Sequence, residues 1–200
     1  SAKVREEMGT RYGIHLPDPR KAFGVKMAAM QKVAKGAKRK DAEWNHALAA
    51  ALWETGWYEA RMGACMVDDP SLVTSTQMDR WVADFDNWGI VDTVCFKLFD
   101  RVDPGLAFGK VRQWTGKREE FVKRAGFALL ACVALHDKGT GDEPFARCLS
   151  LIEKAAGDDR NFVKKGVSWA LRAIGERSAG LRASALGVAK KLEARDGAAQ

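Results

Sequence analysis

Two stretches of the sequence align without gaps at a fixed separation. FVKRAGFALLA occupies residues 121–131, and FVKKGVSWALR occupies residues 162–172, 41 positions further on. A repeat period of this length is typical of arrays in which small groups of helices pack on one another in series. Apolar residues recur at helical spacing along almost the whole chain, whereas strand signals are scarce. The sequence therefore predicts an all-α protein.

The repeat period also indicates the kind of helical array. Periods of about 40 to 47 residues are typical of HEAT repeats. We predict a HEAT-like helical-repeat solenoid with a concave basic groove, formed by residues 1–200 as a single domain. The chain opens at Ser1 without a methionine and stops at Gln200. We therefore expect trimmed termini and a further closing helix beyond Gln200.

Charge is distributed unevenly along the chain. Residues 1–40 carry 11 basic and 3 acidic side chains, residues 41–116 carry 6 and 12, and residues 117–200 carry 16 and 11. Two basic ends around an acidic middle suit a polyanion that is held at its edges, with carboxylates near its centre. A solvated surface of uneven charge is the alternative interpretation.

The cysteines and histidines show neither metal-site nor disulfide spacing. Each cysteine lies inside an apolar helical pattern, which predicts reduced core thiols and no metal. The longest uncharged apolar run, around residues 126–135, is far shorter than the roughly 20 residues of a membrane-spanning helix. No leader pattern opens the sequence. We therefore expect a cytoplasmic protein with no membrane segment.

The stretch FVKKGVSWALRAIGER, residues 162–177, places one tryptophan between two cations. Helical spacing gives it a buried face of four residues: Val163, Val167, Ala170 and Ile174. Trp169 then lies at the margin of this face, with Lys165 and Arg172 just beyond it on the exposed side. Such an indole is either a packing residue with snorkelling neighbours or a ring presented to a ligand.

The matching segment contains a candidate phosphate ligand. Its predicted inward residues are Val122, Ala125, Leu129 and Val133. Arg124 projects from another side, between Ala128 and Ala131, and these small neighbours are expected to leave its guanidinium reachable. A reachable guanidinium can bind phosphate through two hydrogen bonds. A surface salt bridge to Glu120 is the alternative.

The third candidate region is NWGIVDTVCFKLFD, residues 87–100. Helical spacing sends Val91, Val94 and Leu98 into the core. Asp92 instead shares its side with Trp88, Phe96 and Phe99, and a carboxylate among aromatic rings indicates a functional site. In the alternative interpretation, Gly89 caps the helix and Asp92 stabilises its positive end.

Taken together, these segments resemble the DNA alkylation repair family of HEAT-like DNA glycosylases. The similarity runs from about Met8 to about Leu192. It passes through RYGIHLP, LWETGWYEARMGACMVDDP, MDRWVADFDNWGIVDTV, REEFVKRAGFALLACVALHDK and DDRNFVKKGVSWALRAIGER. The sequence departs from the family pattern at Gly89, where many relatives have an acidic residue.

The resemblance implies a base excision repair enzyme without cofactor or metal. Its substrate would be double-stranded DNA that carries cationic alkylated purines such as 3-methyladenine or 7-methylguanine, and its reaction would be hydrolysis of the N-glycosidic bond. We expect it to act as a monomer associated with the nucleoid. By motif position, the catalytic aspartate falls on Asp92, the sugar-contacting tryptophans on Trp88 and Trp169, and the backbone-binding cations on Arg124, Lys165 and Arg172. Basic residues 35–40 are expected to assist in backbone binding.

Two other functions remain open at this point. A catalytically silent protein of the same fold could bind damaged or branched DNA, and a HEAT adaptor could bind a protein. Release of free base would identify an enzyme, whereas binding without release would identify a DNA binder. A protein adaptor would bind with little dependence on salt, whereas phosphate contacts make affinity fall steeply as salt rises.

Overall fold

A computed structural model of the chain describes the backbone of residues 1–198 and the side chains of residues 1–194. Residues 1–198 form helices and connecting loops and contain no β-strand, which confirms the predicted all-α class. The chain divides into two compact units, Ser1–Val102 and Asp103–Gln200, which are described separately below. The assignment of residues 1–200 to a single domain stays a prediction.

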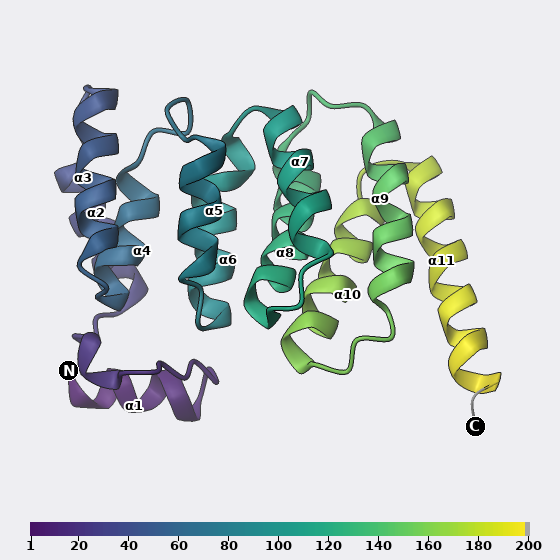
Figure 1. The fold of residues 1–200 in the computed structure, drawn as a ribbon, viewed down its shortest axis with the longest axis horizontal. Coiled ribbons are helices and arrows are strands. Elements are labelled where there is room, and N and C mark those ends of the chain that lie inside the picture. Colours follow the sequence, from purple (N-terminus) through teal and green to yellow (C-terminus); the bar gives the residue numbers. More distant parts are fainter. Residues whose placement is uncertain (199–200) are drawn as a thin grey trace. The chain divides into compact units, whose positions relative to one another are not determined.

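The first unit is built around one central helix. Its α-helices are α1 (Ala2–Thr10), α2 (Met27–Ala37), α3 (Ala42–Glu54), α4 (Tyr58–Val67), α5 (Ser75–Ala83) and α6 (Trp88–Lys97), with 3-10 turns η1 (Pro19–Lys21) and η2 (Phe99–Arg101). Helices α2, α3 and α6 all pack against α4 (Figure 1).

Short polar side chains set the starts of three helices in this unit. Asp41, Thr74 and Asn87 each accept a hydrogen bond from the backbone N–H three residues later. An N-cap of this kind satisfies a donor that the helix itself leaves unpaired. Gly89, which the alternative interpretation took as a helix cap, is wrong as a cap, since it lies inside α6 and Asn87 caps that helix.

The core of the first unit is an aromatic stack. The rings of Trp53 and Trp81 lie parallel, with centroids 4.0 Å apart and an interplanar angle of 4°. Both residues are almost fully buried, and the indole N–H of Trp53 donates to Asp84 at 2.8 Å. Met78, Trp81 and Val82 of α5 are buried, and so is Phe85, which follows the helix.

The second unit is built around α8. Its helices are α7 (Pro104–Thr115), α8 (Glu120–His136), α9 (Asp142–Ala155), α10 (Asn161–Gly175) and α11 (Ala179–Ala198). Helices α7 and α10 both pack against α8 (Figure 1). Gly126 permits the close contact with α7, because a Cβ atom there would lie 2.7 Å from the backbone nitrogen of Thr115.

The two segments related by the 41-residue period lie in neighbouring helices, α8 and α10. Phe121 and Phe162 occupy equivalent repeat positions, and their ring centroids are 5.5 Å apart. The predicted buried face of α10 is confirmed at Val163, Val167, Ala170 and Ile174. On α8, Ala125, Leu129 and Val133 are buried as predicted, whereas Val122 is only half-buried.

The four cysteines lie in the cores of the two units. Cys65, Cys95, Cys132 and Cys148 are all buried, as the sequence predicted. Burial raises the pKa of the Cys65 thiol to about 12 and that of Cys148 to about 11, so both remain protonated near neutral pH. Among residues 1–198, no helix combines the length and the apolar character that crossing a membrane would require.

Candidate functional site

The first group of candidate residues lies on α6. Trp88 is the first residue of the helix, and Asp92 follows four residues later, so the two side chains lie on one side of the helix. Both are half-buried, and so is Phe96, one further turn along. Phe99 was wrongly placed in this row: α6 ends before it, and its fully buried ring packs 6.1 Å from the ring of Trp81.

The indole of Trp88 is held by a segment far away in the sequence. Its Nε1 atom donates a hydrogen bond to the backbone carbonyl of Tyr12 at 3.0 Å. That segment turns back on α1 through a hydrogen bond from the backbone nitrogen of Ile14 to the carbonyl of Met8, at 2.7 Å. The sequence interpretation missed this tether, because a backbone acceptor leaves no residue signal.

Gly89 makes room for the same segment. A Cβ atom at this position would lie 2.9 Å from the Ile14 Cδ1 atom and 3.0 Å from the hydroxyl oxygen of Tyr58. A larger side chain here would therefore require the Ile14 and Tyr58 side chains to shift. Burial raises the pKa of Tyr58, and so its hydroxyl is neutral at physiological pH.

The second group lies on the exposed side of α10. Lys165 and Arg172 are exposed and Trp169 is half-buried between them, which confirms the predicted placement. The guanidinium of Arg172 donates to the hydroxyl of Ser168 at 2.5 Å, and the Lys165 ammonium lies 5.9 Å from the ring centroid of Phe162. An aromatic face with a cation on each side suits a ligand that combines sugars and phosphates.

Arg124 does not lie where the sequence predicted. The residue is only 5% exposed, so the expectation of a readily reachable guanidinium is wrong. Its NH1 group donates to the backbone carbonyl of Phe162 on α10 at 2.7 Å. A Cβ atom at Gly166 would lie 3.6 Å from the Cγ atom of Arg124, an ordinary van der Waals distance, so the approach does not require a glycine there. The spacing of α8 alone could not reveal that α10 covers this side.

A buried carboxylate ties the start of α10 to α8. Asp158 accepts a hydrogen bond from Lys123 on α8 at 2.9 Å and from the Arg160 guanidinium at 2.6 Å. Its side chain is 10% exposed. Hydrogen bonds from Arg160, with a further one from Lys123, hold the pKa of Asp158 well below its usual range. The carboxylate is therefore ionised at neutral pH and anchors the beginning of the helix that carries Trp169.

The six predicted site residues thus form two groups, one in each unit. The α6 pair consists of Trp88 and Asp92. The α10 group consists of Arg124, Lys165, Trp169 and Arg172, of which Arg124 comes from α8. Among the side chains that the structure describes, no three histidine, cysteine or carboxylate groups gather in a way that could hold a metal ion.

Comparison with known proteins identifies the family. A sequence model described as "DNA alkylation repair enzyme" matches residues 2–196. The chain belongs to the DNA alkylation repair family. Its fold is also similar to a solved structure with a TM-score of 0.78 and 20% sequence identity, an alignment that covers 95% of this chain and 77% of the other. That protein represents a family related to the HEAT-like repeat DNA glycosylases, with affinity for branched DNA structures.

These comparisons confirm the HEAT-like helical-repeat fold. The predicted basic groove stays a prediction. No curated protein matches the chain.

Proposed function

We propose that this member of the DNA alkylation repair family is a DNA glycosylase that removes cationic alkylated purines from double-stranded DNA. Family membership over residues 2–196 supports a role in DNA alkylation repair. The observation that carries the finer proposal is the α6 pair, in which a half-buried carboxylate stands one helical turn from a tethered indole. The protein is proposed to act as a monomer, without cofactor or metal.

The chemistry of the substrate explains why a single carboxylate is sufficient. Methylation at N3 of adenine or N7 of guanine leaves the base positively charged, so the base departs as a neutral molecule. As the bond from C1′ to the base nitrogen breaks, the deoxyribose gains oxocarbenium character. The Asp92 carboxylate stabilises this charge and orients the water that adds to C1′, and the proton released from that water passes to solvent.

The two tryptophans have a secondary role in this proposal. An indole face near the deoxyribose stabilises its positive charge by a cation-π interaction of about 0.5 to 2 kcal/mol. The hydrogen bond from Trp88 to the Tyr12 carbonyl supports this role, because it fixes the ring in one orientation. Trp169 is proposed to contact a deoxyribose of the DNA from α10. Its cationic neighbours, Lys165 and Arg172, are proposed to bind the adjoining phosphates.

Arg124 has a structural role in addition to its proposed contact with the DNA backbone. One of its donors is engaged by the Phe162 carbonyl, so it orients the first turn of α10. Contact of Arg124 with a phosphate stays a proposal that rests on the family resemblance.

The lesion should be selected by the charge of the leaving base rather than by the shape of a pocket. In this proposal the protein contacts sugar and phosphate, and none of the six site residues reads the edge of a base. Cationic purines are therefore expected to be good substrates. Neutral lesions, which must leave with a developing negative charge, are expected to be poor ones.

The decisive experiment is base release by the purified protein. Duplex DNA that contains a single 7-methylguanine is incubated with excess protein, and the free base is measured by chromatography. The proposal predicts release well above the spontaneous rate, together with an abasic strand that alkali cleaves. Binding of the same duplex without release would reject the glycosylase.

The fold neighbour favours one second candidate, a DNA binder that does not excise bases. That neighbour belongs to a family with affinity for branched DNA structures. If the chain works in this way, it binds a four-way junction more tightly than a linear duplex of equal length and releases no base from either. Comparing both DNA forms in both assays separates the two functions.

A further inference from the structure

Basic residues are concentrated at one end of the first unit. Residues 19–40 contain eight lysines or arginines and no acidic residue. The segment ends in the loop between α2 and α3, where Lys38, Arg39 and Lys40 follow one another and are all exposed. Three adjacent cations repel one another, so a fixed arrangement of them requires support from the protein.

A buried asparagine provides that support. Asn45 is only 2% exposed, and both ends of its side-chain amide bind the backbone of Arg39. The Asn45 carbonyl accepts from the Arg39 N–H at 2.9 Å, and the Asn45 amide donates to the Arg39 carbonyl at 2.9 Å. A buried amide is costly unless it is hydrogen-bonded, and here both bonds go to one residue of the loop. The core therefore dictates the shape of this basic loop.

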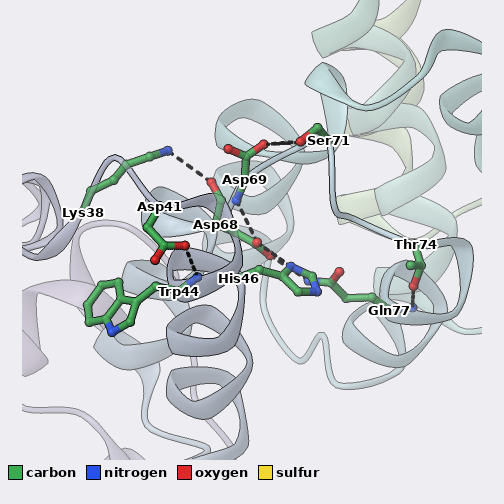
Figure 2. A network of polar contacts seen from close by, with 9 residues as sticks. All are labelled: Lys38, Asp41, Trp44, His46, Asp68, Asp69, Ser71, Thr74 and Gln77. Atoms are coloured by element: carbon green, nitrogen blue, oxygen red, sulfur yellow. Dashed lines mark hydrogen bonds and ion pairs between the residues drawn. The ribbon is translucent and has the colours of Figure 1, made fainter.

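The side chains of the loop are positioned as well. The Arg39 guanidinium lies over the ring of Trp44, 3.7 Å from its centroid. A guanidinium that stacks through its face keeps its N–H edge available to bind an anion. The Lys38 ammonium donates to the backbone carbonyl of Asp68 at 3.2 Å, as Figure 2 shows. Lys40 is exposed.

The loop rests on a rigid polar network. The Asp68 side chain is fully buried and accepts hydrogen bonds from His46 Nδ1 at 2.8 Å, from Gln77 Nε2 at 2.7 Å and from the Asp69 N–H at 2.8 Å (Figure 2). His46 lies on α3 and Gln77 on α5, while Asp68 follows α4. Asp68, whose carbonyl binds Lys38, therefore connects α3, α4 and α5 through hydrogen bonds.

We propose that the basic loop, residues 38–40, is a second binding element for the DNA phosphate backbone, distinct from the cations of the α10 group. The inference rests on the proposed function only in taking DNA as the partner, and it does not depend on catalysis. The loop consists of cations alone, whereas protein interfaces are built on apolar and aromatic centres with few lysines. A row of phosphates matches such a surface.

Removal of two loop cations tests the proposal. For Arg39→Gln/Lys40→Gln, loss of two phosphate contacts lowers the slope of log affinity against log salt by about 1.8 on duplex DNA. The ratio of the affinity at 50 mM salt to that at 200 mM then falls roughly tenfold. The matched control is Lys154→Gln/Lys190→Gln, which removes the same charge from exposed positions on α9 and α11. An equal slope change in both variants would overturn the proposal.

A second variant should act in the opposite direction. Asp41 follows the loop and caps α3 by accepting from the Trp44 N–H at 2.9 Å. Asparagine caps helices about as well as aspartate, so Asp41→Asn removes a negative charge and leaves the helix intact. If phosphate docks on the loop, this variant binds duplex DNA more tightly, by roughly twofold to fivefold at low salt. Unchanged or weaker binding would contradict phosphate docking.

Asn45→Ala tests whether loop shape matters in addition to loop charge. The variant keeps every cation, and its expected loss of DNA affinity disappears in the background of Arg39→Gln/Lys40→Gln. An equal loss in both backgrounds would show that Asn45 only supports the fold. Failure of this idea is distinguishable from failure of the glycosylase, because all three tests measure affinity.

Discussion

The α6 pair and the α10 group are held in place in different ways. Trp88 depends on the carbonyl of Tyr12, a residue 76 positions earlier in the chain. Trp169 is flanked by cations of its own helix, and that helix is fastened to α8 through Arg124 and Asp158. In both groups an indole is presented at the edge of a helix. The first arrangement depends on long-range packing of the N-terminal segment, and the second on contacts between neighbouring repeats.

Because the two groups are held differently, substitutions should be able to affect catalysis and DNA binding separately. A change in the N-terminal segment should disturb the ring beside Asp92 and thereby slow base release. A change at the contact between α8 and α10 should disturb the cations and thereby weaken DNA binding. The substitutions below test this separation.

The largest effect on stability is expected at the contact between α8 and α10. Arg124→Ala leaves the Phe162 carbonyl without the donor that it now has, so the variant should lose about 3 kcal/mol of unfolding free energy, as expected for a buried hydrogen bond to a charged group. Urea denaturation measures the loss. The salt slope of DNA binding should also become shallower by about 0.9 if Arg124 binds a phosphate. An unaltered slope would show that Arg124 binds no phosphate and only stabilises the contact with α10.

The contribution of Asp158 to stability should be lost in acid. Its pKa in the folded protein is depressed below the unfolded value of about 3.9, so its stabilising effect is full above that value and is lost as pH falls through the folded pKa. Asp158→Asn should cost about 2 kcal/mol at pH 7. The difference in Tm between wild type and variant should shrink below about pH 4. A difference that stays constant down to pH 3 would contradict this assignment.

Substitution of Trp88 and of Trp169 compares the α6 pair with the α10 group directly. Each replacement by phenylalanine weakens the cation-π contribution and should slow release of 7-methylguanine, within the range of about 0.5 to 2 kcal/mol. Trp88→Phe also removes the hydrogen bond to Tyr12. Trp88→Phe should therefore slow release more than Trp169→Phe does, whereas Trp169→Phe should weaken DNA binding more. Identical profiles for the two variants would remove the distinction between the groups.

The smallest effect is expected at Gly89. An added methyl group meets the far ends of Ile14 and Tyr58, which can shift, and lies 3.1 Å from the Oδ1 atom of Asn87, so Gly89→Ala should cost about 1 kcal/mol of stability. Because Ile14 belongs to the segment that holds Trp88, base release should fall while DNA affinity stays the same. Gly187→Ala provides the control, since a Cβ there has no atom within 4 Å.

The helical periodicity of the sequence predicted which residues of a given helix are buried and which are exposed. The buried face of α10 is confirmed at every predicted position, because the inward residues of a helix follow from its own 3.6-residue turn. The exposure of Lys165 and Arg172 follows from the same geometry. The 41-residue repeat also identified two neighbouring helices, because equivalent units of a helical array stack on one another.

Contacts between distant segments could not be predicted in this way. Arg124 was expected to be reachable because its own helix leaves space, yet the carbonyl of Phe162 on the next repeat occupies that side. Phe99 was expected to lie beside Asp92 on a continuous helix, but α6 ends first and the ring enters the core.

The central claim is that the Asp92 carboxylate stabilises a positively charged sugar. The measurement that tests it most directly is single-turnover release of 7-methylguanine by wild type and Asp92→Asn, with DNA affinity measured in parallel. The account predicts equal affinity and a release rate about 100- to 1,000-fold lower in the variant, the usual cost of removing one well-placed electrostatic group. Release by Asp92→Asn at the wild-type rate would contradict it.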